Sequence, residues 1–506
     1  MCGIFAILNS KQNQNIQADF MKGAHRGPDH TNLVRISDSL IFGFHRLSIN
    51  GLTNMSNQPF CLDGIYLICN GEIYNYKLLF SQLGITPTTG SDCEIILHLY
   101  KAYGIEQTLH MIDASEFAFV LYDSHKNVLY AARDPYGVRP LFQGVQEDTI
   151  CFASELKMIP SDMKITPILP GTFTDGKINT YCSLPSINYS LDKPNELIFN
   201  TLYECVKKRV ETTERPIACL LSGGLDSSLI AAVVNKCRID LGIKEPLETY
   251  TIGLEGSEDF KYATMMANYL NSKHINILAT ERDFLDAIPE VICAIESRDT
   301  TTVRASVGNY LIAKYIKDNS KAKVIFNGDG ADEVCGGYLY LKLAPNCVEF
   351  DKECRRLVKD IHYFDALRSD RCISHHGLEA RTPFLDRAFV ELYLSIPPKL
   401  RFTMCEKELL RKSFYGFLPN EILWRKKEAF SDGVSSLQKS WYSIIHDHLN
   451  STFQYEYLQA DTSLTIEQYY YKKIYDSHYK VDLLPYYWMP KYTDATDCSA
   501  RTLKTY

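Results

Sequence analysis

The pattern of apolar and turn-forming residues changes near residue 190, and this change limits the folds open to the chain. Before it, short apolar runs are separated by Gly, Pro and Asp, which is typical of short strands joined by turns. After it, strand-length apolar runs alternate with amphipathic stretches of helical length. The polar stretch 184–195, which contains Pro185 and Pro194, separates the two patterns. Because 506 residues are too many for one hydrophobic core, we expect two or three domains.

The first part, to about residue 186, predicts an antiparallel, sheet-rich α+β domain. A helix is expected over 94–103, because Ser91 and Asp92 form a good N-terminal capping signal before it. The expected strands are 65–69, 117–122, 128–132 and 149–153.

The second part predicts a doubly wound parallel sheet, because strands and helices alternate at short spacing. The expected strands are 217–221, 249–254, 275–278 and 323–326, and the expected helices are 196–210, 225–235, 259–271 and 284–295. The chain from Tyr338 to about Tyr479 is expected to be mostly helical. The polar residues after Trp488 are expected to form an extended tail.

Composition excludes some classes of partner. The formal net charge of -7 gives no basic footprint for nucleic acid, and the apolar runs are too short for a membrane span. The 16 cysteines contain no C-x-x-C pair, so we expect mostly buried, reduced thiols. With no signal-peptide pattern at the N-terminus, a cytoplasmic location is expected.

Cys2 directly follows the initiator residue Met1. If Met1 is removed, the free α-amino group of Cys2, with an ordinary pKa of about 8, can act as general base for the neighbouring thiol. Taken alone, a cysteine at the second position is more often accidental. Asn70 and Gly71 follow a predicted strand, and an Asn amide with a Gly backbone N–H can form an oxyanion hole.

Two charged residues could anchor an amino-acid substrate in this first part. Arg46 could bind a substrate carboxylate bidentately, or it could form a surface salt bridge. Asp92 could hold a substrate ammonium group, or it could simply cap the helix that follows. The residues alone leave these alternatives open.

The stretch Leu220–Ser228, LLSGGLDSS, follows a predicted strand and opens a helix. Glycines permit close approach of a ligand, and a helix N-terminus favours an anion. No Walker A lysine occurs here. A second loop, Asn327–Glu333, is acidic, and Asp226 and Asp332 could together hold Mg²⁺. The alternative for this loop is a tight turn with solvated carboxylates.

Two basic residues could bind phosphate in the second part. Arg304, at a predicted helix start, could clamp phosphate or a substrate carboxylate. Lys427 could neutralise developing phosphate charge, although the run 425–427 could also be a solvated basic patch.

Seven motifs of the first part resemble, in order, the class II glutamine amidotransferase domain, an N-terminal-nucleophile αββα sandwich. The motifs are Cys2–Ile4, Arg26–Asp29, His45–Ser48, Asn70–Asn75, Ser91–Asp92, Arg133–Gly137 and Phe152–Glu155. The resemblance implies Cys2 as nucleophile with Asn70 and Gly71 as oxyanion hole. It implies glutamine binding by Arg46, Leu47, Ser48, Ile49, Asn50, Asn70, Gly71, Glu72 and Asp92.

Nearly the whole chain resembles the glutamine-hydrolysing asparagine synthetase family. Besides the motifs above, Gly377–Asp386, Lys426–Gly433 and the tail 488–503 carry this likeness. It implies that ammonia from glutamine attacks a β-aspartyl-AMP formed from ATP and aspartate, in a second domain of the adenine nucleotide α-hydrolase-like fold. A homodimer is compatible with it. The implied synthetase residues are Arg304, Asp329 and Lys427 for catalysis, Leu220, Ser222, Gly223, Gly224, Asp226, Ser227, Ile252, Asn327 and Gly328 for ATP, and Asp226 and Asp332 for Mg²⁺.

The expected organisation is a glutaminase domain over 2–186, a linker over 187–195, a synthetase domain over 196–490 with C-terminal helices, and a tail over 491–506. The acidic loop departs from the family's usual SGEGSDE, since Asn327, Asp329 and Ala331 replace Ser, Glu and Ser. The alternatives are a lactam-forming synthetase or another amide synthetase acting on a different carboxylate, a scaffold protein without activity, and a plain N-terminal-nucleophile hydrolase.

Overall fold

The computed structural model describes residues 1–10, 15–113, 116–428, 430–436, 438–481, 483 and 488–503. Its backbone divides into two compact units. The first consists of Met1–Ser183 with two segments from later in the chain, Glu211–Pro216 and Ser374–Glu379. The second consists of Leu184–Val210, Ile217–Ile373 and Ala380–Tyr506.

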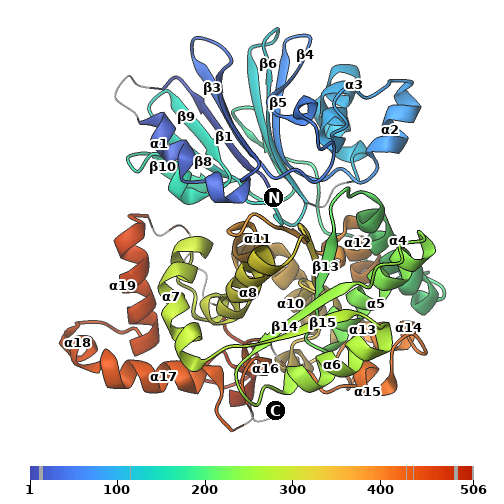
Figure 1. Ribbon diagram of the computed structural model, residues 1–506, viewed down its shortest axis with the longest axis vertical. Helices are drawn as coiled ribbons and strands as arrows, with labels where there is room; N and C mark the ends of the chain where they lie inside the picture. Colours follow the sequence, from blue (N-terminus) through green and yellow to red (C-terminus); the bar gives the residue numbers. More distant parts are fainter. Residues whose placement is uncertain are drawn as a thin grey trace. The chain divides into compact units, whose positions relative to one another are not determined.

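The first unit contains two six-stranded antiparallel sheets, which confirms the predicted sandwich (Figure 1). One sheet has the order β10-β8-β9-β1-β3-β2. Its strands are β1 Gly3–Leu8, β2 His30–Arg35, β3 Leu40–Arg46, β8 Phe142–Gln146, β9 Thr149–Ala153 and β10 Lys164–Pro167. The other has the order β12-β11-β7-β6-β5-β4. Its strands are β4 Phe60–Leu62, β5 Ile65–Gly71, β6 Phe117–Asp123, β7 Val128–Arg133, β11 Thr172–Thr174 and β12 Ile178–Thr180.

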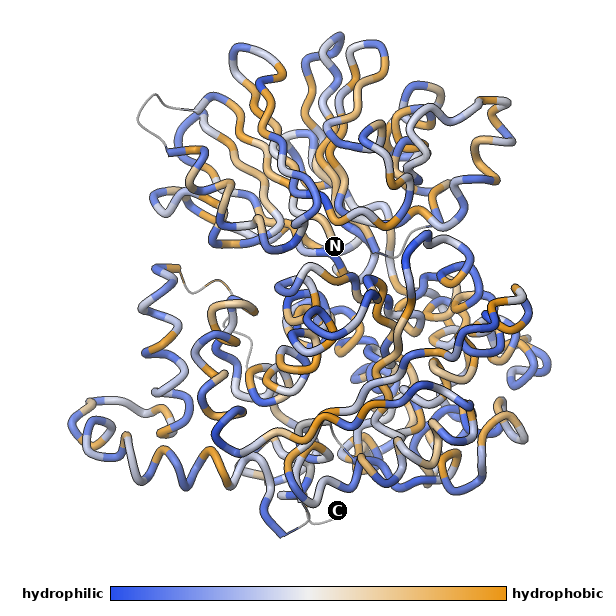
Figure 2. The backbone as a smooth tube through the Cα atoms, in the orientation of Figure 1, coloured by the Kyte–Doolittle hydropathy of each residue, from blue (hydrophilic) through white to orange (hydrophobic). Residues whose placement is uncertain are grey.

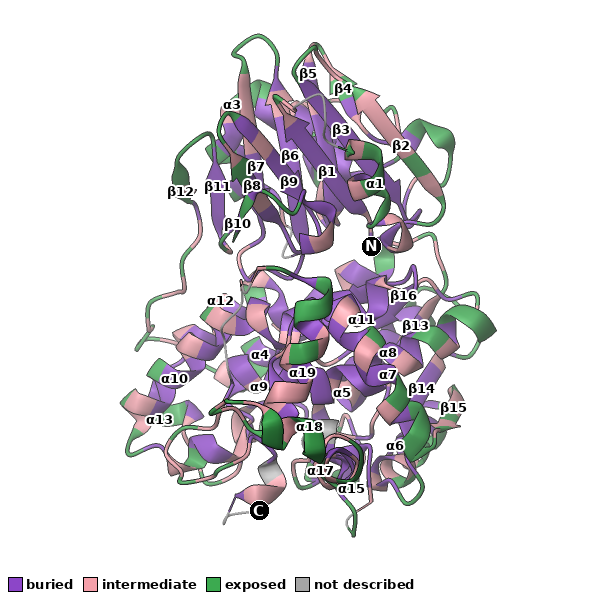
Figure 3. Cartoon of the chain, turned by 90° about the vertical axis from the view of Figure 1, so that its left-hand side faces the viewer, coloured by how far each residue is buried: buried purple, intermediate pink, exposed green. Residues whose placement is uncertain are grey.

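Alternate residues of β5 and β6 pack into two different cores, as the period of a strand requires. Leu67 and Phe119 belong to a cluster shared with α2 and α3, whereas Ile68 and Val120 belong to a cluster shared with β1 and β3. Figure 3 shows these strands largely buried, and Figure 2 shows hydrophobic residues gathered along the strands. The central strands are therefore covered on both faces.

The helices of the first unit are α1 Ile16–Met21, α2 Tyr76–Leu83 and α3 Ile95–Met111, with a short 3₁₀ helix, η3, at Asp92–Glu94. The helix predicted over 94–103 is confirmed, but α3 continues beyond it. Gly104 has a positive φ of 78° and interrupts the helical backbone, and the chain then resumes helical geometry. A glycine that normally ends a helix here only kinks it.

The second unit is built on a five-stranded sheet of order β15-β14-β13-β16-β17, in which β15, β14, β13 and β16 pair in parallel. This confirms the predicted parallel sheet. The strands are β13 Ile217–Leu220, β14 Glu248–Gly253, β15 Lys273–Leu278, β16 Val324–Phe326 and β17 Glu379–Arg381. The carboxyl ends of parallel strands form the edge at which such sheets bind ligands.

Sixteen helices accompany this sheet in the described chain, and none of them joins the length to the apolar character that a membrane crossing needs. They are α4 Pro194–Glu211, α5 Leu225–Asp240, α6 Glu258–Leu270, α7 Glu281–Ile295, α8 Thr300–Asn319, α9 Ala331–Cys335, α10 Cys347–Asp360, α11 Asp365–Ser374, α12 Arg387–Ser395, α13 Pro398–Arg401, α14 Glu408–Ser413, α15 Asn420–Leu423, α16 Phe430–Gly433, α17 Trp441–Thr452, α18 Gln454–Gln459 and α19 Ile466–His478.

The tail does not extend away from the second unit as predicted. Cys498, Ser499 and Leu503 are buried, and residues 500–502 form a 3₁₀ turn. Asp497 pairs with Arg304, and Ser499 donates a hydrogen bond to Asp432. The polar residues of this segment therefore form contacts within the unit. Residues 504–506 lie outside the described part.

Candidate active sites

Cys2 lies immediately before β1, where the ends of β1, β3 and β5 meet. Gly3 pairs with His45 across the antiparallel strands, so the start of β1 lies beside the end of β3. The Cys2 thiol donates to the carbonyl oxygen of Leu47 at 3.7 Å, and the Cys2 backbone N–H donates to Asn70 Oδ1 at 3.0 Å. The sheet topology thus brings the predicted nucleophile to the predicted oxyanion residues.

The Asn70 amide has an available donor beside the thiol-bearing residue. Its Oδ1 is held by Cys2, while Nδ2 is buried and has no hydrogen-bond partner among the described residues. Buried donors are normally paired, so an unpaired one at this place suits an oxyanion that forms during reaction. At Gly71, a Cβ atom would lie 2.6 Å from the carbonyl oxygen of Glu116, so no side chain fits there.

We expect Asn70→Ala to lower kcat for glutamine hydrolysis on the order of 100-fold, because one oxyanion donor is lost. Steady-state glutamate release measures this, with Asn179→Ala in the exposed strand β12 as matched control. If the Asn70 variant kept more than about half of the wild-type kcat, Asn70 would not be an oxyanion donor.

Arg46 ends β3 and is buried, not exposed in a surface salt bridge. Its guanidinium donates to the carbonyl oxygens of Thr53 and Gly51 at 2.9 and 2.5 Å and to Asn57 Oδ1 at 2.7 Å. Burial lowers its pKa. Since these partners are neutral oxygens, the hydrogen bonds orient the guanidinium but leave its charge to attract a carboxylate.

Glu72 and Asp92 are both buried at the end of β5. Glu72 Oε2 accepts a hydrogen bond from Asn50 Nδ2 at 2.8 Å, and Asp92 Oδ2 accepts one from the Ile73 N–H at 2.7 Å. The side chain that caps η3 is Ser91. Asp92 is therefore not the capping side chain, and its carboxylate is directed to the strand end that also carries Asn70.

A later segment of the first unit, Glu211–Pro216, holds the predicted glutamine-binding stretch 47–50 and the following Gly51 in place. Arg215 Nε donates to the Ser48 carbonyl oxygen at 2.7 Å, and the Glu214 N–H donates to that of Ile49 at 3.2 Å. Glu214 Oε1 accepts from the Gly51 N–H at 2.7 Å. The sequence patterns did not indicate these residues, because nothing local to them marks a contact with a strand end so distant in the chain.

Cys2 is half-buried, and buried side chains such as Arg26 and Asn70 surround it. Arg26 donates to the Cys2 carbonyl oxygen at 2.9 Å and pairs with Glu155 at 3.0 Å, so two of the sequence motifs fix the backbone of Cys2. Burial raises the pKa of the Cys2 thiol to about 11 and lowers that of the Met1 amine to about 6. While Met1 is attached, the thiol is therefore protonated at neutral pH.

In the second unit, the loop between β13 and α5 has the geometry of an anion-binding turn. Ser222 Oγ accepts from the Gly224 N–H at 3.2 Å and lies 3.0 Å from Ser227 Oγ. Gly223 has a φ of 71°, and a Cβ atom there would lie 2.3 Å from the backbone of Tyr262, so only glycine fits. The N-terminus of the 16-residue helix α5 adds a positive dipole end.

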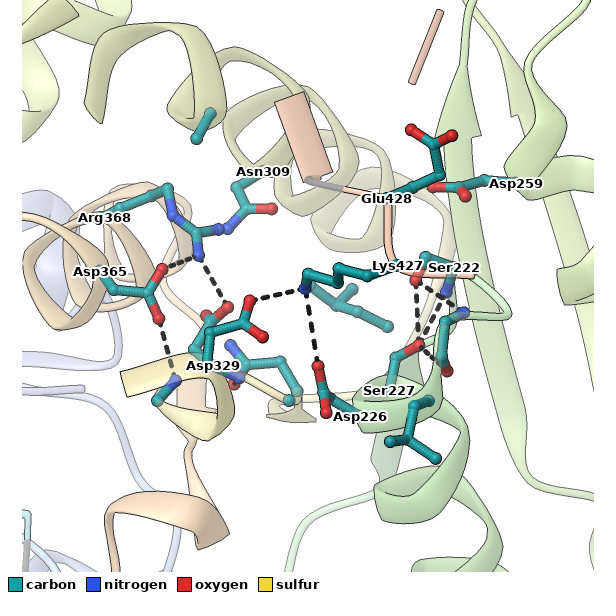
Figure 4. A pocket seen from close by; sticks show the side chains of 18 of the residues that line it. Ser222, Asp226, Ser227, Asp259, Asn309, Asp329, Asp365, Arg368, Lys427 and Glu428 are labelled. Carbon is teal, nitrogen blue, oxygen red and sulfur yellow. Dashed lines mark hydrogen bonds and ion pairs between the residues drawn. The ribbon is translucent and has the colours of Figure 1, made fainter. Parts of the chain in front are cut away.

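A pocket opens at the carboxyl ends of β13, β14 and β16 (Figure 4). It is lined by every predicted ATP-binding residue except Gly223, and by Asp329, Asp332 and Lys427. The predicted residues in its lining are Leu220, Ser222, Gly224, Asp226, Ser227, Ile252, Asn327, Gly328, Asp329, Asp332 and Lys427. The loops that the sequence singled out separately therefore form one site.

Two lysines stand between the two predicted metal-binding carboxylates. Lys407 pairs with Asp226 at 2.5 Å and also with Asp332, and Lys427 pairs with Asp332 at 2.6 Å. Burial acts to raise the pKa of Asp332, but Lys407 and Lys427 outweigh burial and hold that pKa well below its usual range. Lys407 was not indicated by the sequence, since the stretch around it carries no recognisable phosphate-binding pattern.

The same carboxylates could also take part in binding Mg²⁺. Asp226 Oδ1 is buried without a hydrogen-bond partner among the described residues, which leaves a hard oxygen ligand available. No group of three or more His, Cys, Asp or Glu side chains in the described ranges could hold a metal by itself. Two carboxylates fit an ion that takes its remaining ligands from ATP phosphates and water.

Asp329 faces a buried arginine instead of a lysine. Arg368, from α11, pairs with Asp329 at 2.8 Å and with Asp365, and Asp365 accepts from the Gly330 N–H at 2.9 Å (Figure 4). Burial raises the pKa of Asp329 to about 6, with the Asp365 carboxylate adding to the rise and Arg368 opposing it. Asp329, whose side chain is shorter than the glutamate usual in the family, is thus held by Arg368 at the pocket wall.

The raised pKa of Asp329 predicts a pH-dependent stability. Because the folded state binds this proton more tightly than the unfolded chain does, ionised Asp329 lowers the free energy of unfolding as pH rises from about 4 to about 6. Asp329→Asn removes this effect, so the variant should gain stability relative to wild type over that range, by up to about 3 kcal/mol. Urea unfolding at several pH values measures it, and a difference that does not change with pH would contradict the assignment.

Arg304, which the sequence suggested as a clamp for phosphate or a substrate carboxylate, does not line the nucleotide pocket. Its guanidinium is buried and pairs with Glu467 of α19 at 2.5 Å and with Asp497 of the tail at 2.7 Å, while it stacks over the ring of Tyr442. With two carboxylates on one guanidinium, its hydrogen-bonding edge is occupied. In this structure Arg304 holds the tail and α19 together, and its catalytic role stays a prediction.

The two halves define an amidotransferase joined to an ATP-using synthetase, and comparison with known proteins agrees. Residues 1–173 match the glutamine amidotransferase domain family, and residues 198–349 and 344–489 match the asparagine synthase family. Over 560 aligned residues the chain is 40% identical to the asparagine synthetases (glutamine-hydrolysing) of Cricetulus griseus, Mus musculus and Gallus gallus, with 100% of this chain and 99% of each relative covered. The chain belongs to the glutamine-hydrolysing asparagine synthetase family.

Proposed function

We propose that this chain makes asparagine from aspartate, using ATP and nitrogen taken from glutamine. The observation that carries the proposal is the unpaired Asn70 donor beside Cys2, in a chain that is similar over its full length to glutamine-hydrolysing asparagine synthetases. In this proposal, residues 2–186 hydrolyse glutamine, 196–490 form the synthetase, 187–195 join them, and 491–506 are the tail.

The glutaminase step begins after removal of Met1. The Cys2 nitrogen, which already donates to Asn70 Oδ1, then becomes a buried amine that can take the thiol proton. The thiolate attacks the glutamine amide carbon, and Asn70 Nδ2 and the Gly71 N–H stabilise the oxyanion. The protonated Cys2 amine gives its proton to the amide nitrogen as the C–N bond breaks, so ammonia leaves and a thioester remains. Water then releases glutamate and restores the thiol. Arg46 binds the substrate carboxylate, with Leu47–Asn50 forming the pocket wall, and Glu72 and Asp92 bind the ammonium group.

In the synthetase step, ATP lies on the loop Ser222–Ser227, with its pyrophosphate at the N-terminus of α5. The aspartate side-chain carboxylate attacks the α-phosphorus, pyrophosphate leaves, and ammonia then displaces AMP to give asparagine. Asp226 and Asp332 would hold Mg²⁺, which neutralises phosphate charge when bound. Lys407 and Lys427 supply fixed positive charge beside the leaving pyrophosphate, and Asp329 with Arg368 borders the place of the acceptor.

The test of this function follows the nitrogen atom. Glutamine labelled with ¹⁵N at its amide is incubated with ATP, Mg²⁺ and a panel of carboxylic acids, and products are identified by mass spectrometry. We expect labelled asparagine from aspartate, with AMP and pyrophosphate formed in equal amounts. Product from another acid would favour a different amide synthetase, and ring closure without label would favour a lactam synthetase. Hydrolysis of glutamine without AMP would indicate a plain hydrolase, and no turnover at all a scaffold.

Two further properties are part of the proposal. Buried thiols such as Cys151, Cys205 and Cys219 support a reducing compartment, and we propose the cytoplasm.

A homodimer is compatible with the resemblance, and light scattering on the purified protein would test it.

A further inference from the structure

The C-terminal segment Asp497–Leu503 contacts the part of the chain that carries Lys427. Arg501 donates to the carbonyl oxygens of Asp432 and Ser436 at 2.9 and 2.7 Å. Ser499 Oγ donates to Asp432 Oδ1 at 2.8 Å. Asp432 belongs to α16. The tail therefore fastens the chain just beyond the basic run 425–427.

Arg501 also reaches the residue next to Lys427. Its guanidinium lies 3.8 Å from the Glu428 carboxylate, and both Lys427 and Glu428 line the nucleotide pocket. One side chain thus contacts Glu428 at the pocket and two backbone carbonyls of 432–436. A guanidinium with its fixed donor geometry suits such multiple contact better than a flexible ammonium does.

This segment also rests on Ser257, which precedes α6, and on Asp259 in the first turn of α6. Arg425 pairs with Asp259 at 2.8 Å, and Ser257 Oγ donates to the Gly433 carbonyl oxygen at 2.7 Å. A Cβ atom at Gly433 would lie 2.6 Å from the Asp259 carboxylate, so the packing is close. The lysine-bearing segment therefore contacts both the start of α6 and the tail.

The tail itself is anchored to the body of the second unit through the buried side chain of Arg304. Asp497 pairs with Arg304 of α8, and Arg304 also pairs with Glu467 of α19. Thr301, one helical turn before Arg304, lines the pocket. The anchor of the tail therefore lies on the same helix that forms a pocket wall.

We propose that the C-terminal tail is part of the synthetase site, and that Arg501 is a positioning residue that sets the place of Lys427. The inference rests on the proposed function, since it gives Lys427 its role beside pyrophosphate. The 2.6 Å pair between Lys427 and Asp332 requires the segment to stay in register with the pocket. Loss of Arg501 leaves the Ser499–Asp432 hydrogen bond as the remaining contact named here between the tail and the segment. A shift of about 1 Å at a catalytic group can cost on the order of 100-fold in rate.

The test replaces Arg501 in the full-length enzyme and uses two measurements. Arg501→Gln should lower kcat for pyrophosphate release, at saturating ATP, aspartate and ammonium, by about tenfold or more. It should also speed trypsin cleavage after Arg425, Lys426 and Lys427 several-fold relative to other sites, as followed by mass spectrometry. Arg501→Lys keeps the charge but not the paired donors, and should fall between Arg501→Gln and wild type in both measurements.

The matched control is Lys491→Gln, which removes a cation of the same tail that pairs with Glu353 of α10 and not with residues 425–436. It should leave both measurements at wild-type values. The inference is overturned if Arg501→Gln keeps wild-type kcat, if it loses activity with no change in cleavage at 425–427, or if cleavage rises equally at all sites. If wild type itself released no pyrophosphate, the proposed function would fail, while the cleavage experiment would still decide whether the tail holds this segment.

Discussion

Cys2→Ala should abolish glutamine hydrolysis, with a loss on the order of 10⁴-fold or more, yet leave synthesis from ammonium chloride at its wild-type rate. The thiol is the nucleophile, and neither the Asn70 amide nor a bound water replaces it in forming the thioester. The nucleotide pocket is lined entirely by residues of the second unit, so the substitution leaves its chemistry intact.

To test this prediction, asparagine production by the Cys2→Ala variant is measured with glutamine and, in parallel, with ammonium chloride as the nitrogen source. Cys61→Ala, at an exposed cysteine of β4, is the matched control and should retain both activities. Loss of both activities in the Cys2 variant would refute separable sites. Mass spectrometry of the active protein should also show Met1 removed, because burial keeps the thiol protonated while Met1 is attached.

The strands were the part of the fold best predicted from sequence. β9 was expected over 149–153 and forms there, because a short apolar run bounded by polar residues has few alternatives. The continuation of α3 beyond Gly104 and the docking of the tail were not predicted. Both depend on tertiary contacts, which override local signals from glycine or from polar composition.

The residues of the candidate sites also fall into two groups, those that local sequence patterns predicted and those that tertiary packing brings to the site. Asn70 is the next-to-last residue of β5, Ser222 comes two residues after β13, and Asn327 directly follows β16. Topology alone therefore brings these residues to the ends of strands. Lys407 and Arg368 reach the nucleotide pocket from helical parts of the chain far from those loops, and no local pattern marks them. Their place depends on packing of the second unit, which the sequence patterns do not specify.

Arg304 shows why a motif on a helix is less informative than one on a loop. The residues of α8 that line the pocket include Thr301, Ala305, Asn309 and Ile312, which recur at helical spacing on one face. Arg304 lies outside that stripe, although it is adjacent to Ala305 in sequence. Helical phase decides which residues face the ligand, and the sequence alone did not fix that phase.

Lys407→Met is expected to be the most damaging change in the nucleotide pocket. It leaves the carboxylates of Asp226 and Asp332 without the buried ammonium that pairs with both. Breaking a buried pair costs about 3–5 kcal/mol of stability, and loss of a fixed charge beside the phosphates should lower kcat for pyrophosphate release on the order of 10³-fold. Since Lys407 and Lys427 hold the pKa of Asp332 below its usual value of about 4, the stability deficit should be full at neutral pH and should shrink only as pH falls below about 4.

Two companion variants separate stability from catalysis. Lys412→Met, at an exposed cation of the same helix region that pairs with Glu408, should change neither quantity. Adding Asp226→Asn to Lys407→Met removes one unpaired carboxylate, so it should recover part of the lost stability while synthesis stays low. Urea unfolding and pyrophosphate release measure the two effects. A Lys407→Met enzyme with normal kcat would show that Lys407 only neutralises buried carboxylates, and recovery of activity in the double variant would show that the loss arose from misfolding and not from missing charge at the phosphates.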